Sequence, residues 1–221
     1  MNDYTLPEKG RVALVTIGAQ RDCMLTGSPV MASDARRAAI AIGRLAAGFR
    51  RQGAPIVHSV RLYRPDGSNV DLCRRQAVEE GLRILMPGTF GTELAEGLAP
   101  SPEIRLDPNL LFDGCAQKLD RNEWALYKPR WGAFFGTKLE DHLRALDMTT
   151  LVLCGCNFRT AIRATVYEAS ARDFRIVVAT DGVSGASEEA LSELGRMGIY
   201  LMTTDSCLTW LSGAADSNAA A

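Results

Sequence analysis

The chain has 221 residues, of which 47% are hydrophobic, enough for one substantial hydrophobic core. Its 25 lysine and arginine residues balance 26 aspartate and glutamate residues, so no excess of basic charge suggests nucleic acid as a partner. No apolar stretch is long enough to span a bilayer, and the N-terminus does not resemble a signal peptide, so we expect no membrane association and a cytoplasmic location.

Strand and helix patterns alternate along the first part of the chain. Residues 11–17 form a short β-rich run, and the apolar side chains of 33–51 recur at helical spacing. A second strand is predicted at 56–60 and a helix at 71–80, with Asp71 as its N-cap. Residues 87–120 are rich in glycine and proline and lack a clear period, so we expect a lid or a subunit contact there.

The same alternation continues to the C-terminus. We predict strands at 124–127, 150–154, 176–179 and 200–203, and helices at 138–146, 160–172 and 188–197. Strands separated by helices favour right-handed crossovers. The expected fold is therefore a three-layer α/β/α domain around a mostly parallel six-stranded sheet, with residues 1–213 as a single domain and 214–221 as a disordered tail.

Ligands of parallel sheets bind beyond the carboxyl ends of the strands. This rule selects 18–23, 61–68, 128–135 and 156–163 as wall segments of a pocket. The pocket side chains predicted within them are Gln20, Asp22, Arg61, Tyr63, Trp131, Phe135 and Cys156. Gln20 is expected to bond to nearby backbone. Trp131 and Phe135 fit a core or a dimer contact as readily as a pocket wall.

Cysteine usage suggests neither disulfides nor a metal. The six residues Cys23, Cys73, Cys115, Cys154, Cys156 and Cys207 are scattered, which favours reduced thiols. Only Cys154 and Cys156 lie close enough in sequence to suggest a metal site, and a structural zinc needs four ligands. His58 and His142 have no supporting cluster. We expect no metal and no other cofactor.

Three ordered segments resemble motifs of the isochorismatase-like cysteine hydrolases. Residues 15–22 are similar to the first strand with its Asp-x-Gln motif, 127–137 to the segment that bears a lysine, and 154–165 to the turn that bears the nucleophile. The resemblance covers nearly the whole chain. It implies the fold above, assembly into a homodimer or homotetramer, and hydrolysis of an amide or a vinyl ether by an Asp, a Lys and a Cys.

The resemblance, taken residue by residue, leaves one of these three groups. Lys128 matches the lysine, whereas Gly18 occupies the position of the aspartate and Ala161 that of the cysteine. Removing the nucleophile of a catalytic triad costs about a million-fold in turnover, so we expect hydrolysis at position 161 to be absent. Backbone donors at Asn157 and Ala161, with Arg159, are expected to hold an anion or a developing oxyanion.

Three hypotheses follow. The first is a small-molecule enzyme of specialised metabolism that performs non-covalent cyclisation, elimination or isomerisation on a carbonyl or carboxylate compound, with Lys128 as acid and base. The second is a hydrolase with relocated residues that uses Cys156 or Cys23 as nucleophile. The third is a pseudoenzyme that binds a ligand or a partner without turnover. The sequence does not name the substrate.

Overall fold

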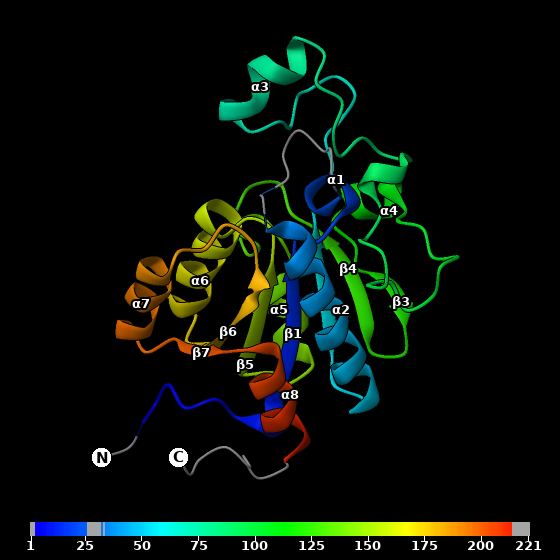
Figure 1. Ribbon diagram of the computed structural model, residues 1–221. Helices are drawn as coiled ribbons and strands as arrows, with labels where there is room; N and C mark the ends of the chain where they lie inside the picture. Colours follow the sequence, from blue (N-terminus) through cyan, green and yellow to red (C-terminus); the bar gives the residue numbers. More distant parts are fainter. Residues whose placement is uncertain (1–2, 26–31, 33, 214–221) are drawn as a thin grey trace.

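The computed structural model describes residues 3–25, 32 and 34–213. A central sheet with the strand order β3-β4-β2-β1-β5-β6-β7 is covered by helices on both faces (Figure 1). The strands are β1 Val12–Ile17, β2 Ile56–Val60, β3 Gln117–Asp120, β4 Glu123–Tyr127, β5 Thr150–Gly155, β6 Arg175–Val183 and β7 Tyr200–Met202. Only β3 and β4 pair antiparallel. The predicted α/β fold is thus confirmed, with seven strands.

The strand that was not predicted is β3, which falls in the segment for which no regular structure was predicted. It lies at the edge of the sheet, and its four residues alternate between partly buried and exposed. Leu119 is its only apolar residue, so no apolar pattern marks it, and pairing with β4 defines it instead. The prediction of six strands was therefore one too few.

The helices are α1 Arg21–Met24, α2 Ala35–Arg51, α3 Leu72–Glu79, α4 Pro108–Phe112, α5 Leu139–Ala145, α6 Arg163–Ser170, α7 Glu188–Arg196 and α8 Thr204–Ser212. Single 3-10 turns occur at Lys9–Arg11 and Phe90–Thr92, and a π-helical turn at Phe158–Ile162 leads into α6. Helix α2 follows its prediction, although the expected start at Ser33 and the tail 214–221 lie outside the described residues. Helices α1, α4 and α8 were not predicted.

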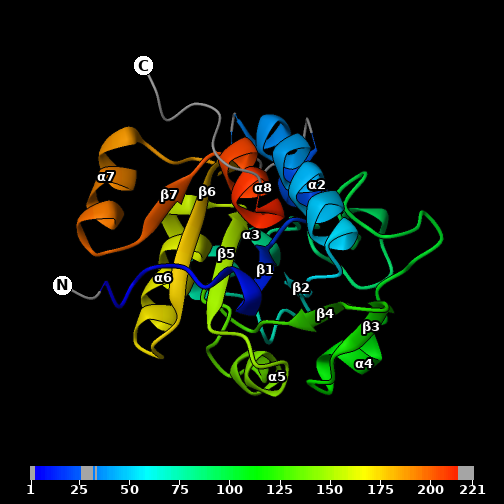
Figure 2. The same cartoon turned by 90° about the horizontal axis from the view of Figure 1, so that it is seen from below.

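The sheet has a hydrophobic core on each face. Successive side chains of β1 point to opposite faces, so that Leu14 packs in a cluster with Leu45 of α2, and Val15 in a cluster with Leu143 of α5. Figure 2 shows α2 and α8 on one side of the sheet and α5 and α6 on the other. Burial of a side chain as large as Phe49 contributes about 2 kcal/mol, and these two cores fix the strand ends that carry the candidate site.

A buried polar network joins the central strands. His58 of β2 is fully buried between Thr16 Oγ1, at 2.8 Å from Nδ1, and Glu123 Oε1, at 2.7 Å from Nε2. The Arg50 guanidinium donates two hydrogen bonds of 2.7 Å to the same carboxylate. Burial alone would raise the pKa of Glu123, but the hydrogen bonds from Arg50 and His58 hold it below its usual value. His58 is therefore a structural residue with both ring nitrogens satisfied.

Helix α3 projects beyond the carboxyl ends of the strands, away from the sheet (Figure 1), and none of its residues is buried. Asp71 occupies its N-cap position but makes no capping hydrogen bond. Its carboxylate instead accepts a hydrogen bond of 3.0 Å from the Tyr63 hydroxyl and lies 3.5 Å from a nitrogen of Arg61. Asp71 is thus the N-cap residue, as predicted, but its side chain makes no capping hydrogen bond because it contacts the buried Arg61 and Tyr63 instead.

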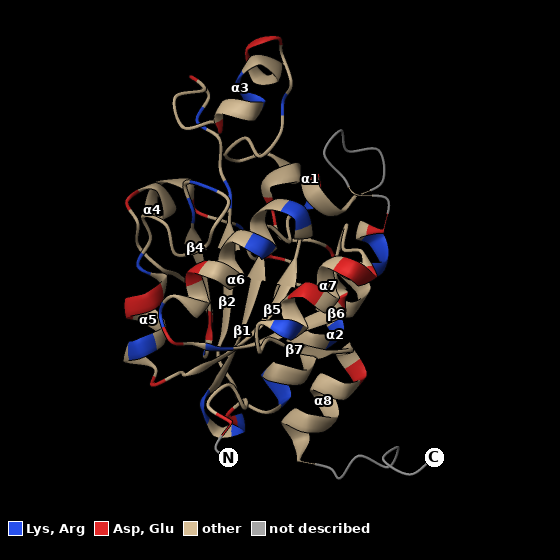
Figure 3. Cartoon of the chain, turned by 90° about the vertical axis from the view of Figure 1, so that its left-hand side faces the viewer, with Lys and Arg blue, Asp and Glu red and all other residues tan. Residues whose placement is uncertain are grey.

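The surface carries both signs of charge. In Figure 3, ribbon positions of acidic and of basic residues are interspersed along the chain, and neither sign is confined to one part of the cartoon. Within the described ranges, no helix is both long enough and apolar enough to cross a membrane.

Candidate active site

A narrow cavity of about 40 Å³ lies beyond the carboxyl ends of the central strands. The register of the strands explains its position. Ile17 pairs with both Ser59 and Gly155, and Val60 pairs with Tyr127. The residues that follow these strands, Gly18, Arg61, Lys128 and Cys156, therefore lie at the same edge of the sheet. Its walls are Gly18, Cys23, Arg61, Tyr63, Asp71, Arg74, Leu85, Lys128, Trp131, Cys156, Asn157, Thr160 and Ala161. All four predicted wall segments contribute.

Lys128, which follows β4 directly, is the buried lysine of this cavity. Its side chain is 4% exposed, and its ammonium donates to the carbonyl oxygens of Arg130, at 3.0 Å, and Trp131, at 3.1 Å. Burial, together with repulsion from Arg61, lowers the pKa of Lys128 to about 8. Both the ammonium and the free amine are therefore accessible near neutral pH, as proton transfer requires.

Arg61 is held in place by neutral and acidic groups. Its guanidinium donates to the carbonyl oxygens of Leu62, at 3.0 Å, and Asn69, at 2.5 Å, and to the Tyr127 hydroxyl at 3.2 Å. It also lies over the ring of Tyr63, 4.5 Å from its centroid. Yet its Nε is buried and has no hydrogen-bond partner among the residues that the structure describes. One donor of this lining residue thus lacks an acceptor within the described part of the chain.

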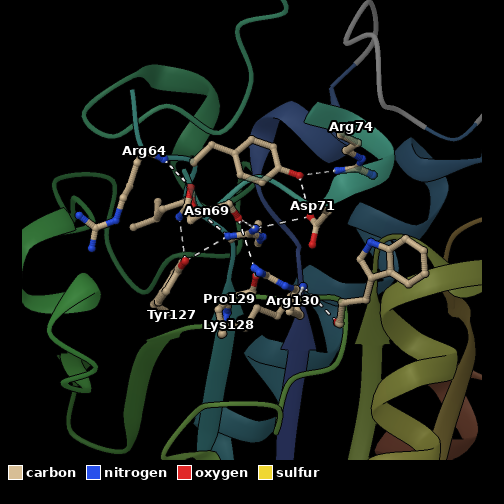
Figure 4. A network of polar contacts seen from close by, with 12 residues as sticks. Arg64, Asn69, Asp71, Arg74, Tyr127, Lys128, Pro129 and Arg130 are labelled. Atoms are coloured by element: carbon tan, nitrogen blue, oxygen red, sulfur yellow. Dashed lines mark hydrogen bonds and ion pairs between the residues drawn. The ribbon is translucent and has the colours of Figure 1, made fainter. Parts of the chain in front are cut away.

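Two further charged residues come from the start of α3. The Tyr63 hydroxyl donates to Asp71 and accepts a hydrogen bond of 3.2 Å from Arg74, so the three side chains form one network with Arg61 (Figure 4). Asp71 is the only carboxylate among the lining residues, against the cations Arg61, Arg74 and Lys128. The cavity is therefore electropositive.

Sequence reasoning missed Arg74 and the site role of Asp71. Asp71 and Arg74 are three residues apart at the start of a helix that follows a predicted wall segment, a spacing that makes their side chains neighbours near the pocket. This signal was missed because Asp71 was considered only as a helix cap. Residues 87–120, by contrast, contribute nothing to the cavity wall. The end of that segment forms β3 beside β4, and the expectation of a lid or a subunit contact there stays a prediction.

Positions 18 and 161 lie on the same cavity wall as Lys128, as their register predicted. Gly18 has a φ of +59°, and a Cβ added there would lie 2.8 Å from the carbonyl oxygen of Cys156. A carboxylate side chain at position 18 would thus require the backbone to move. Ala161 is buried and presents a methyl group. The pocket as folded provides Lys128 without a neighbouring acid at position 18 or a thiol at position 161.

A thiol does reach the cavity from position 156. Cys156 is 7% exposed, its thiol donates to the carbonyl oxygen of Cys23 at 3.5 Å, and its peptide bond to Asn157 is cis. A hydrogen bond from the Cys23 thiol, supported by the Ser184 hydroxyl and by Arg74, lowers the pKa of Cys156 to about 7 in spite of burial. The same thiol contact and burial raise the pKa of Cys23.

Two predicted pocket residues support the wall from behind. Gln20 is fully buried, and its side-chain amide donates to the carbonyl oxygens of Arg61 and Thr92 and accepts from the Arg61 N–H at 2.7 Å. It thus fixes the backbone of Arg61, as expected. The Asp22 carboxylate accepts a hydrogen bond of 2.6 Å from the N–H of Leu85. Neither side chain lines the cavity.

Two other predicted residues lie outside the cavity. Arg159 is exposed and does not line the cavity, so its position does not support the expected part in anion binding there. Asn157 does line the cavity, and its Oδ1 accepts a hydrogen bond of 2.8 Å from the Arg159 N–H. Phe135 is 59% exposed and lines a shallow neighbouring groove together with Leu72 and Trp131.

Among the described residues, no group of three or more His, Cys, Asp or Glu side chains is arranged to hold a metal ion. The chemistry available to the cavity wall is therefore that of one lysine, two arginines, one carboxylate, one phenol and two thiols.

Comparison with known proteins agrees with this fold. The family model described as the isochorismatase domain matches residues 12–206, so the chain belongs to the isochorismatase family. It is similar to the uncharacterised isochorismatase family protein YecD of Escherichia coli O157:H7, with 32% identity over 80% of this chain and 81% of that protein. A probable inactive nicotinamidase of Arabidopsis thaliana is 27% identical over 80% of this chain and 82% of its own length.

A solved structure has the same arrangement. An isochorismatase family protein from Desulfovibrio vulgaris superposes with a TM-score of 0.77 and 30% identity, over 91% of this chain and 98% of that chain. The resemblance of the sequence to the isochorismatase-like hydrolases is thereby confirmed at the level of the superfamily.

Proposed function

We propose that this protein is an enzyme that binds a small carboxylate or carbonyl compound in the cavity and transforms it by non-covalent acid–base chemistry at Lys128. The observation that carries the proposal is the electropositive wall, where Arg61, Arg74 and Lys128 face the single carboxylate of Asp71. A buried donor without an acceptor costs about 1–3 kcal/mol, so an anionic oxygen that reached Arg61 Nε would recover that free energy on binding.

The chemistry divides between two kinds of group. Lys128, with its pKa of about 8, takes or returns a proton next to a carbonyl, while Arg61 and Arg74 stabilise the negative charge that develops on oxygen. The backbone amides of Asn157 and Ala161, which also line the cavity, act as further oxyanion donors in this proposal. Cyclisation, elimination and isomerisation all need these two functions and no nucleophile at position 161.

The experiment is a calorimetric titration at pH 7 with a panel of small carboxylic acids and their neutral amides. Lys128→Met is compared with wild type, and Lys138→Met, which changes an exposed lysine, is the matched control. We expect at least one acid to bind, its amide to bind roughly tenfold more weakly, and Lys128→Met to lose binding by a similar factor. Equal binding of acids and amides, or an unaffected Lys128→Met variant, would contradict the proposal.

Cys156 favours a second candidate, hydrolysis of an amide or a vinyl ether with Cys156 as a relocated nucleophile. Its thiol lines the cavity and its pKa of about 7 gives a substantial thiolate fraction without a base at position 18. An acyl adduct on Cys156 in intact-mass spectra supports this candidate, and full activity of Cys156→Ala ends it. Binding of a carboxylate without turnover in any assay would favour a pseudoenzyme.

We also propose that the chain self-associates as a homodimer or homotetramer. Leu72 is 83% exposed and Phe135 59% exposed, and both line the groove beside the cavity. Large apolar side chains gathered at one place are typical of an interface.

A further inference from the structure

Two thiols from distant parts of the sequence meet on the cavity wall. Cys23 lies in α1 and Cys156 follows β5, and both are free. The Cys156 sulfur lies 3.5 Å from the carbonyl oxygen of Cys23, and each thiol shifts the pKa of the other. Both residues line the same small cavity, so their side chains are neighbours on its wall.

The surroundings of Cys156 favour its ionised form. The Ser184 hydroxyl is fully buried and is one of the groups that lower the pKa of the Cys156 thiol. The Arg74 guanidinium adds a positive charge on the same side. Both groups, with the Cys23 S–H, stabilise a thiolate in the way that donors and cations do at reactive cysteines.

The remaining cysteines provide comparisons within the same molecule. Cys154 and Cys207 are buried, and burial raises the pKa of each thiol, that of Cys207 to about 12. Cys73 and Cys115 are exposed to solvent. The chain thus contains one activated thiol with a neighbouring thiol, two inert ones and two that are merely accessible.

We propose that Cys156 is a site of oxidation by hydroperoxides and that Cys23 is its resolving thiol. The Cys156 thiolate attacks one peroxide oxygen, the O–O bond breaks, and the departing hydroxide takes up the proton that the thiol had released, leaving a sulfenic acid and water. The Cys23 thiol then displaces the sulfenic oxygen as a second water and forms a disulfide. The two thiols thus supply the two electrons that reduce one hydrogen peroxide to two waters.

This chemistry goes beyond the proposed function and does not require it. Hydrogen peroxide is not much larger than water, whose share of liquid volume is about 30 Å³, so it fits the cavity of about 40 Å³. Because both sulfur atoms belong to the cavity wall, the disulfide alters the wall beside Lys128. Oxidation is therefore expected to weaken whatever binds in the cavity.

The test uses the full-length reduced protein and a low concentration of hydrogen peroxide. Samples are quenched by alkylation and digested without reductant, and each cysteine peptide is quantified by mass spectrometry. We expect a Cys23–Cys156 linked peptide, and we expect Cys156 to be lost roughly tenfold faster than Cys73 and Cys115, since the pKa of Cys156, about 7, gives it a substantial thiolate fraction near neutral pH. Faster oxidation of either exposed thiol would overturn the proposal.

Two variants separate the steps. In Cys23→Ala, the sulfenic acid on Cys156 should persist and be trapped by dimedone, whereas Cys156→Ala should leave Cys23 reduced. Cys73→Ala is the control and should behave as wild type. Cys23→Ser repeats the first test if Cys23→Ala fails to fold. Absence of a dimedone adduct at Cys156 in a folded Cys23 variant would contradict the proposal, and carboxylate binding by the reduced protein reports separately on the proposed function.

Discussion

Replacing Lys128 by methionine should make the protein more stable at neutral pH. Burial of the ammonium moves the pKa of Lys128 from 10.5 to about 8, a shift that corresponds to a cost of ~3 kcal/mol for keeping the charged form in the folded state. Lys128→Met removes this cost but also two hydrogen bonds to carbonyl oxygens, each worth about 1 kcal/mol. The expected net gain at pH 7 is about 1 kcal/mol in the free energy of unfolding.

The sign of this difference should reverse with pH. Between about pH 8 and pH 10.5 the unfolded chain still binds the Lys128 proton, whereas the folded chain has lost it. The free energy of unfolding of wild type therefore rises with pH in this window. Above the window, the cost of burying the ammonium is absent. Lys128→Met gains nothing there and should be the less stable protein, by about 2 kcal/mol, near the upper end of the window.

Urea unfolding of both proteins at the two ends of this window measures the difference. Other groups titrate in the same range, but they do so in both proteins, so the comparison isolates Lys128. Lys138→Met, at an exposed lysine, should show no pH-dependent difference from wild type. A stability difference between wild type and Lys128→Met that does not change with pH would refute the view that this ammonium is strained by burial.

Three further predictions concern the other groups of the site. Alkylation of Cys156 should have a pH midpoint near 7, set by Cys23, Ser184 and Arg74. The ratio of its alkylation rate with iodoacetate to that with iodoacetamide should exceed the same ratio for exposed Cys73 roughly tenfold, because the cavity cations attract the anionic reagent. Equal ratios for the two cysteines would argue against an electropositive cavity. Gly18→Ala should lower the free energy of unfolding by at least about 2 kcal/mol in chemical denaturation, because of its left-handed φ and the 2.8 Å approach to Cys156 O, and a neutral effect would show that the turn has room for a side chain. Leu72→Glu with Phe135→Glu should shift sedimentation toward the monomer, whereas Ile40→Glu, at another exposed apolar site, should not; an unchanged assembly would place the interface elsewhere.

The sequence predicted the elements that burial makes obvious. Buried strands such as β1 and β5 are continuous apolar runs, and the amphipathic pattern of α2 is regular, so their positions and the four wall segments could be inferred. The rule that ligands bind beyond the carboxyl ends of parallel strands then brought Gly18, Lys128 and Ala161 to one place.

What the sequence left out depends on tertiary contacts. Strand β3 exists because β4 offers an edge. Helix α8 packs Cys207, Leu208, Trp210 and Leu211 in the core, and Thr203 at its N-cap and the left-handed Gly213 at its end were signals that the prediction missed. The electropositive character of the cavity was hidden for a similar reason. In the sequence, Asp71 fits the pattern of a helix N-cap, and only the structure shows that its carboxylate pairs with Arg61.

The most direct test of the central claim is the titration of Lys128 itself. Lysine side chains labelled by reductive methylation with ¹³C can be followed by NMR, with Lys128→Met identifying the resonance. The account predicts a pKa of about 8 in the free protein and a rise when a small carboxylate binds beside Arg61 and Arg74. A Lys128 that titrates at the ordinary value of 10.5, unaffected by any carboxylate, would contradict it.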